Sequence, residues 1–314
     1  MDTERLSGLY EGMLRAMLWE QRLLRLIDEG KVSGFYHSGR GQEAVPVGAI
    51  AALRDDDYLL YAHRGCAYMI AKGLPLSKLF GDFLANTAGT TRGLGAGIVH
   101  IAWPELGILG QSGTLGGAFP IAAGAGLSAR YQGTDQVVMC FFGEATQNRG
   151  TFHEALNAIA LWKLPVVLVC ENNEWAVSVS AKDSTSVEDV ADRAKGYNFP
   201  GRVVDGMDVE AVNEAAVEAV ERARNGEGPT LIEAKTYRFR GHYEGDPASY
   251  REKADLDRWQ KRDPIIALAN KLSDAGVDVE EMQARLNREV DEALEEAQKA
   301  PMPGRERIFE DVYA

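Results

Sequence analysis

Two kinds of polar group that suit a hard metal cation follow two apolar runs of this chain. Glu144 stands just past the apolar run 137–142, and Asn172 and Asn173 stand just past the run 166–170. A carboxylate and an amide oxygen are the donors that Mg²⁺ prefers when it holds a phosphorylated ligand. A turn acid and two loop asparagines without a ligand fit the same spacing equally well, because such residues commonly follow strands in α/β proteins.

The segments around these residues predict that they meet. Both apolar runs are typical of strands buried on both faces, and Gly150 opens a helical pattern between them. A strand, helix and strand within about thirty residues is the size of a parallel crossover. Such a crossover brings the carboxyl ends of both strands to one edge of the sheet, where open parallel sheets bind ligands. We therefore expect Glu144 and Asn173 to lie close together.

Two further stretches carry residues that suit a phosphate or a proton transfer. His63 and Arg64 end the predicted strand 58–61, and the arginine fork can hold a phosphate by paired hydrogen bonds. His242 lies in the loop 238–247 with two arginines and two acids, which is the material for a proton relay. A surface arginine and an exposed, idle loop histidine remain the alternatives.

Composition excludes several classes of protein. The net charge of −13 argues against a nucleic-acid partner, which needs a basic surface. No apolar run reaches 18 residues, so no membrane span is expected, and the N-terminus lacks the apolar stretch of a signal peptide. The cysteines are Cys66, Cys140 and Cys170, an odd number with two inside apolar strands, which favours buried thiols in a reducing cytoplasm.

The rest of the chain predicts one α/β domain over residues 1–314. It begins with an amphipathic helix over 3–29 and ends in a helical region over 254–314 that lies on the surface of the sheet. Further strands are expected at 202–204 and 230–235, and a polar loop at 178–184. Residues 86–117 are rich in Gly and Thr, so we expect them to be mobile or closely packed and to need a ligand or partner for order.

The central stretch also resembles a known signature. Residues 143–173 resemble the thiamine diphosphate motif, in which Gly-Asp-Gly is followed some thirty residues later by Asn-Asn. His153-Glu-Ala-Leu-Asn157 and Leu161-Trp-Lys-Leu-Pro165 resemble the version found in the α subunits of 2-oxo acid and acetoin dehydrogenase complexes. The resemblance implies a thiamine diphosphate-binding fold with a mainly parallel sheet flanked by helices.

The same resemblance implies roles for individual residues. Glu144, Asn173 and the main-chain carbonyl of Trp175 would hold Mg²⁺. Arg64 and His63 would bind the diphosphate, and His242 would lie near it and near the substrate channel. The remaining implied cofactor contacts are Gly143, Ala145, Thr146 and the carbonyls of Gly113 and Leu115, with the Leu115 side chain beneath the thiazolium.

Four departures from the family pattern stand out. Gly143-Glu144-Ala145 replaces Gly-Asp-Gly, so the acid is one methylene longer and Ala145 disfavours a positive φ that Gly would allow. Cys66 stands where the family often has a histidine. Tyr243 stands where animal pyruvate enzymes carry a regulatory serine, so phosphorylation control is not expected there. Glu144, Ala145 and Cys66 motivate one alternative, a non-catalytic or differently ligated relative.

The resemblance further implies an enzyme of two chains. The α subunit would hold the metal and the diphosphate, and a β subunit would supply the glutamate that activates the cofactor in an α2β2 assembly. The product would be an acyl or hydroxyalkyl group passed to the lipoyl arm of a partner acyltransferase. Pyruvate, another 2-oxo acid and acetoin are not distinguished. A split transketolase or decarboxylase without a lipoyl partner is the second alternative.

Overall fold

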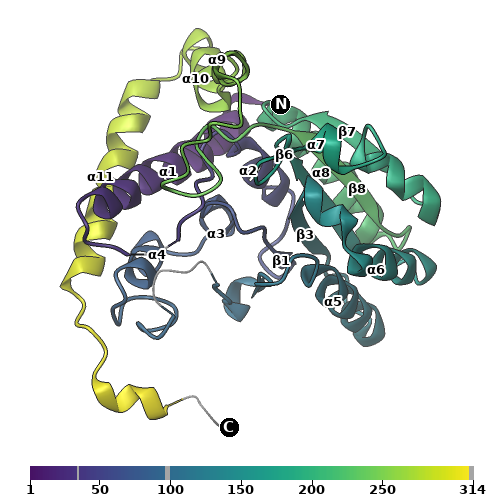
Figure 1. Cartoon of the computed structure of the whole chain (residues 1–314), viewed down its shortest axis with the longest axis horizontal. Coiled ribbons are helices and arrows are strands. Elements are labelled where there is room, and N and C mark those ends of the chain that lie inside the picture. Colours follow the sequence, from purple (N-terminus) through teal and green to yellow (C-terminus); the bar gives the residue numbers. More distant parts are fainter. Residues whose placement is uncertain (34, 96–99, 311–314) are drawn as a thin grey trace.

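The computed structural model describes residues 1–33, 35–95 and 100–310. Within these residues, six strands form one sheet in the order β2-β1-β3-β4-β8-β7, and every neighbouring pair is parallel (Figure 1). The strands are β1 (Tyr58–Leu60), β2 (Ile108–Gly110), β3 (Val138–Gly143), β4 (Val166–Asn172), β7 (Gly201–Asp205) and β8 (Thr230–Lys235). The predicted α/β fold with a parallel sheet is confirmed.

Side chains of the central strands alternate between two apolar cores. In β3, Met139 and Phe141 enter one core, whereas Val138, Cys140 and Phe142 enter the other. The first core contains residues of α2 (Ala44–Ile50) and α8 (Val209–Arg224). The second contains residues of α5 (Ala118–Gln132), α6 (Gly150–Leu161) and the 3₁₀ helix η3 (Val190–Tyr197). Helices on both faces explain why these strands are continuous apolar runs.

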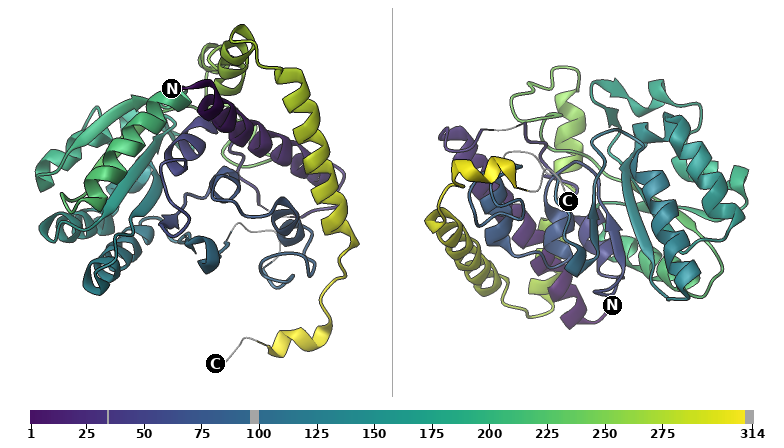
Figure 2. Two further views of the ribbon diagram at one scale, coloured as in Figure 1. Left: turned by 180° about the vertical axis from the view of Figure 1, so that it is seen from behind. Right: turned by 90° about the horizontal axis from the view of Figure 1, so that it is seen from below.

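The N-terminal helix lies beside the C-terminal helices. α1 (Thr3–Asp28) runs along α11 (Val279–Lys299), as Figures 1 and 2 show, with Arg15 paired to Glu289 at 2.6 Å and Arg22 to Asp291 at 2.8 Å. The region from 254 onward also contains α9 (Lys253–Gln260), α10 (Pro264–Asp274) and the 3₁₀ helix η4 (Arg305–Phe309). Residues 311–314, which the predicted helical region includes, lie outside the described residues.

One loop differs from expectation. The predicted polar loop 178–184 contains β6 (Val179–Ser180), which pairs with β5 (Trp175–Ala176), and the short helix α7 (Ala181–Ser184). The start of the Gly- and Thr-rich segment 86–117, after α4 (Leu76–Phe83), is closely packed, since Asp82 accepts hydrogen bonds from Thr90 Oγ1 at 2.7 Å and from the Thr91 N–H at 3.0 Å. The other short elements of the described chain are α3 (Ala67–Ala71), η1 (Pro104–Leu106) and η2 (Glu144–Asn148).

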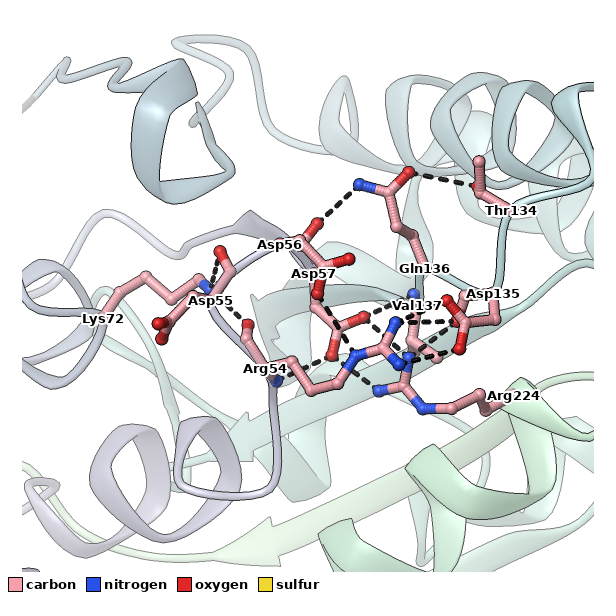
Figure 3. A network of polar contacts seen from close by, with 10 residues as sticks. All are labelled: Arg54, Asp55, Asp56, Asp57, Lys72, Thr134, Asp135, Gln136, Val137 and Arg224. Atoms are coloured by element: carbon pink, nitrogen blue, oxygen red, sulfur yellow. Dashed lines mark hydrogen bonds and ion pairs between the residues drawn. The ribbon is translucent and has the colours of Figure 1, made fainter.

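An ion-pair network joins the amino ends of the strands (Figure 3). Asp57 is fully buried and accepts from the Val137 N–H at 2.8 Å and from Arg224 Nη2 at 2.7 Å. Arg54 pairs with Asp135 at 2.6 Å beside it. The network ties the start of β1, the start of β3 and the end of α8 together, so this edge of the sheet is occupied by structural contacts. None of the described helices is long and apolar enough to cross a membrane.

Candidate functional site

The opposite edge of the sheet carries the main cavity. After β1 the chain adds β2 on one side of β1, and it then adds β3 and β4 on the other side. The direction in which successive strands are added therefore reverses between β1 and β3. Ligands of open parallel sheets bind at such reversals, beyond the carboxyl ends of the strands. A cavity of about 660 Å³ lies there, lined by residues that follow β1, β2, β3, β4 and β8. Its size is that of a site for a small molecule or cofactor.

The structure brings every predicted site residue to this cavity. Glu144 and Asn173 both line it, as expected, and the main chain of Asn173 lies close enough to the Glu144 carboxyl to lower its pKa. The predicted site residues that line the cavity are His63, Arg64, Gly113, Leu115, Gly143, Glu144, Ala145, Thr146, Asn173, Trp175 and His242. Their placement supports a common role, and the individual roles remain proposals.

The turn after β3 positions Glu144. Gly143 ends the strand with extended backbone, and Glu144 begins the 3₁₀ helix η2. Ala145 is the second residue of that helix and has no positive φ. The positive φ that glycine would allow is therefore not used at this position, because a 3₁₀ turn uses the right-handed region that any residue adopts.

Glu144 is a buried acid with spare acceptor capacity. Its residue is 2% exposed, and burial raises the pKa of its carboxyl, while the Asn173 N–H and the nearby charges of Arg238 and Arg64 act in the opposite direction. Its Oε1 atom is buried without a hydrogen-bond partner among the described residues. A buried acceptor left unpaired is unfavourable, and a bound cation would satisfy it.

The loop after β4 supplies two more oxygen atoms. Asn173 Oδ1 accepts from the Trp175 N–H at 3.3 Å, and its amide nitrogen donates to Gln42 Oε1 at 3.3 Å. The Trp175 carbonyl accepts from Arg238 Nη1 at 3.2 Å. Each of these acceptor oxygens retains a second lone pair. Val177, at φ +57°, holds a strained left-handed conformation that is rare for a β-branched residue and marks this loop as a special position.

These oxygens fit a hard divalent cation. Glu144 supplies a carboxylate, Asn173 an amide oxygen and Trp175 a carbonyl, which are the donor types of magnesium sites. In the described part of the chain, no group of three or more His, Cys, Asp and Glu side chains could hold a metal. The three predicted ligands do not form such a group, because Glu144 is the only His, Cys, Asp or Glu among them.

Arg64 is a cation without a close carboxylate partner among the described residues. Its Nη1 donates to the Ser38 carbonyl at 2.9 Å, and its Nη2 lies 3.1 Å from the His242 carbonyl and 3.2 Å from His242 Nδ1. Burial, assisted by the charge of Arg238, lowers the pKa of Arg64 to about 10. A desolvated guanidinium held by neutral acceptors is suited to bind an anion.

Four histidines surround the mouth of the cavity. The ring of His37 lies 4.7 Å from those of His63 and His242, and the ring of His63 lies 5.6 Å from that of His100. His37 Nδ1 donates to the His242 carbonyl at 2.7 Å, which assigns the proton of neutral His37 to Nδ1. His242 Nδ1 faces the Arg64 donor, which assigns its proton to Nε2. Burial lowers the pKa of both His37 and His242 to about 4, so both are neutral at pH 7.

The acids beside His242 make a hydrogen bond and an ion pair within the loop. Asp246 accepts from the main-chain N–H of His242 at 2.6 Å, and Glu244 pairs with Arg240 at 2.6 Å. Both acids therefore hold the loop in shape, and the imidazole of His242 faces Arg64.

The sequence reasoning missed several residues of the cavity wall. His37, His100, Gln111 and Arg238 line it, and no spacing pattern marks them because they come from separate loops. Glu171 also lines it, accepts a hydrogen bond from the Tyr68 hydroxyl, and has its pKa raised to about 7 by burial. An acid at the end of an otherwise apolar strand was the one available signal for Glu171.

Comparisons with known proteins agree with one another. The family described as "Dehydrogenase E1 component" matches residues 11–306. The chain is 39% identical to the alpha subunit of acetoin:2,6-dichlorophenolindophenol oxidoreductase from Bacillus subtilis, over 99% of this chain and 94% of that protein. The protein of the same name from Cupriavidus necator is 39% identical, over 100% and 95%. The chloroplastic pyruvate dehydrogenase E1 component subunit alpha-3 of Arabidopsis thaliana is 38% identical, over 98% and 74%.

Proposed function

The chain belongs to the dehydrogenase E1 component family, and we propose that it is the alpha subunit of a thiamine diphosphate-dependent dehydrogenase acting on pyruvate, another 2-oxo acid or acetoin. The names of its relatives, all dehydrogenase or oxidoreductase alpha subunits, favour this function over a split transketolase or decarboxylase. The observation that carries the proposal is the meeting of Glu144, Asn173 and the Trp175 carbonyl in a cavity that also holds Arg64.

The cavity fits the metal and the diphosphate. Glu144, with its unpartnered Oε1, Asn173 Oδ1 and the Trp175 carbonyl would hold Mg²⁺. Arg64 would bind the diphosphate, which would supply the anion that its buried guanidinium lacks. When bound, thiamine diphosphate supplies a carbanion that attacks the substrate carbonyl. The protein contributes binding, orientation and the exclusion of water.

Two neutral histidines offer a donor and an acceptor beside this site. His242 carries its proton on Nε2, and His37 leaves its Nε2 free to accept, because the Nδ1 atom of each ring is already engaged. We assign to His242, with His63 next to it, the task of holding a proton near a substrate oxygen. Neutral imidazoles suit this task, since they donate without adding a charge to the pocket.

Exposed apolar side chains at the cavity and along α5 and α6 support contact with a second chain. Leu115 is 63% exposed at the cavity, and Ile121 and Tyr131 are exposed on α5, as is Trp162 at the end of α6. A β subunit of the same enzyme type is the proposed partner, in an α2β2 assembly, together with a lipoyl-bearing acyltransferase. The three buried free thiols support a cytoplasmic location.

The test is reconstitution with a β subunit. The chain is purified alone and with a co-expressed β subunit of the family, and reduction of 2,6-dichlorophenolindophenol is followed with pyruvate or acetoin. We expect activity only with both chains, thiamine diphosphate and Mg²⁺. Release of carbon dioxide from pyruvate, or of acetaldehyde from acetoin, identifies the substrate class. An αβ complex that fails to bind thiamine diphosphate in the presence of Mg²⁺ would overturn the proposal and favour a non-catalytic relative.

A further inference from the structure

A buried carboxylate on the N-terminal helix has no part in the site described above. Glu20 lies on α1 and is 6% exposed. Its Oε2 accepts from the Tyr36 hydroxyl at 2.8 Å and from the Gly39 N–H at 2.9 Å, and its Oε1 accepts from the Ser38 hydroxyl. All three donors belong to the segment 36–39. A carboxylate that receives several hydrogen bonds compensates for its burial and fixes the groups that donate to it.

The segment held by Glu20 in turn holds the proposed diphosphate-binding arginine. The Ser38 carbonyl accepts from Arg64 Nη1 at 2.9 Å, and the His37 carbonyl accepts from the Gly65 N–H at 2.8 Å. His37 also donates to the His242 carbonyl at 2.7 Å, and Arg64 Nη2 donates to the same carbonyl at 3.1 Å. Segment 36–39 therefore sets the place of Arg64 from one side and that of the His242 loop from the other.

The two backbones touch directly. A Cβ built on Gly65, which has φ +73°, would lie 2.9 Å from Gly39 Cα, and one built on Gly39 would lie 3.1 Å from Gly65 Cα. Either side chain would force the segments apart, and each Cβ would also lie 3.5 Å from Glu20 Oε2. Because no side chain separates the two glycines, a displacement of Gly39 passes to Gly65 and to its neighbour Arg64.

We propose that Glu20 is a positioning residue for the diphosphate end of the cofactor, acting on Arg64 through the segment 36–39. The inference rests on the proposed function, and it adds a residue outside the cavity to the machinery that binds the cofactor. Glu20 touches neither cofactor nor substrate in this role. Its carboxylate holds the segment 36–39 in place by hydrogen bonds, and that segment holds Arg64.

The experiment replaces Glu20 by glutamine in the complex with the β subunit. Glutamine has nearly the same volume, but its amide nitrogen cannot accept, so at least one of the three donors loses its partner. We expect the affinities for thiamine diphosphate and for inorganic pyrophosphate, each measured by calorimetry with Mg²⁺, to fall by about tenfold or more, the loss expected for one hydrogen bond to a charged group. At saturating cofactor, kcat should stay within about twofold of the wild type. Excess thiamine diphosphate occupies the weakened site, and the rate of the chemical step does not depend on Glu20.

Two variants control this measurement. Glu4→Gln makes the same change at an exposed position of the same helix and should leave both affinities unchanged. Tyr36→Phe removes one donor and leaves Glu20 with Ser38 and Gly39, so it should weaken pyrophosphate binding by a smaller factor than Glu20→Gln. It also serves as the test if Glu20→Gln does not fold.

The outcomes separate the two proposals. If the wild-type complex binds no thiamine diphosphate, the proposed function fails and this inference fails with it. If the wild type binds and Glu20→Gln, or Tyr36→Phe in its place, matches its pyrophosphate affinity, only the role of Glu20 is overturned. A lower melting temperature with unchanged affinity would show a structural role alone and would also overturn it.

Discussion

Replacement of Arg64 by methionine distinguishes two effects of its buried guanidinium. One is its effect on the free energy of unfolding, and the other is its effect on the binding of thiamine diphosphate. Burial lowers the pKa of Arg64 from 12.5 to about 10. A folded-state pKa below the unfolded value means that folding disfavours the cation at every pH below about 10, so the full penalty is present at pH 7. The difference corresponds to roughly 3 kcal/mol.

The substitution also removes three hydrogen bonds. The His242 carbonyl keeps its bond from His37 Nδ1, and His242 is only half-buried, so water can donate to its Nδ1 atom. The Ser38 carbonyl, in contrast, loses the donor it has in Arg64. Leaving that acceptor unpaired costs about 1–3 kcal/mol. The two effects oppose each other, so the free energy of unfolding of the cofactor-free complex should change by less than about 2 kcal/mol.

Cofactor binding should change much more. At a concentration of thiamine diphosphate one hundred times its Kd, the wild-type complex gains about 2.7 kcal/mol of stability, whereas Arg64→Met should gain almost none. The assay is thermal unfolding with and without thiamine diphosphate and Mg²⁺. With about 2 °C per kcal/mol for a chain of this size, the wild type should shift by about 5 °C and the variant by less than about 1 °C.

Arg224→Met is the matched control. The same change at this position should lower the stability of the cofactor-free complex and leave its response to the cofactor intact. Arg224 pairs with the fully buried Asp57 at 2.7 Å in the network of Figure 3. Its loss leaves a buried carboxylate unpaired, at a cost of about 3–5 kcal/mol, while the response to cofactor should be kept. The reasoning is refuted if Arg64→Met retains the cofactor-induced shift, or if it destabilises the cofactor-free complex more than Arg224→Met does.

Three further predictions concern the proposed metal ligands and His37. Asn173→Ala should abolish Mg²⁺-dependent retention of thiamine diphosphate, measured by calorimetry, because it removes the amide oxygen; normal retention would count against the metal assignment. Glu144→Asp should keep Mg²⁺ binding within about tenfold, since the charged oxygen donor remains, and a complete loss in a metal titration would show that the longer arm is required. Because the pKa of His37 falls from 6.5 to about 4 on folding, its neutral form stabilises the fold above pH 6.5, and this stability should be lost as the pH falls from 6.5 to 4. Urea titrations across that range should show a shallower pH dependence for His37→Asn, and an unchanged slope would contradict the origin assigned to it.

The central strands and the meeting of Glu144 with Asn173 were predictable from sequence. Apolar runs buried on both faces, a helical pattern between them and the fixed geometry of a parallel crossover leave little freedom for where the strands end. The conformation after β3 was not predictable, because the residue types Gly143, Glu144 and Ala145 do not by themselves distinguish the 3₁₀ turn found there from a turn with a positive φ.

The contacts of the loop histidine show the same limit. The sequence places two arginines and two acids beside His242, yet Asp246 binds its backbone and the side chain contacts Arg64, 178 positions away in the chain. Proximity along the chain does not decide which donor meets which acceptor, because loop backbones have many conformations of similar energy. The same holds for His37, which reaches the cavity only through the fold of its loop.

The sequence by itself predicted the class of fold, because the periodicity of the apolar residues is sufficient for it, and its motifs pointed to the family by their resemblance. It also placed along the chain the oxygens that we propose as metal ligands, because their residue types are those that a hard cation prefers. Only the tertiary structure decided which partners the buried groups have: the Oε1 atom of Glu144 has none among the described residues, the guanidinium of Arg64 has only neutral acceptors, and the carboxylate of Glu20 accepts from the segment 36–39. The physical reason is that desolvation depends on everything packed around a group, and that packing joins segments far apart in the chain.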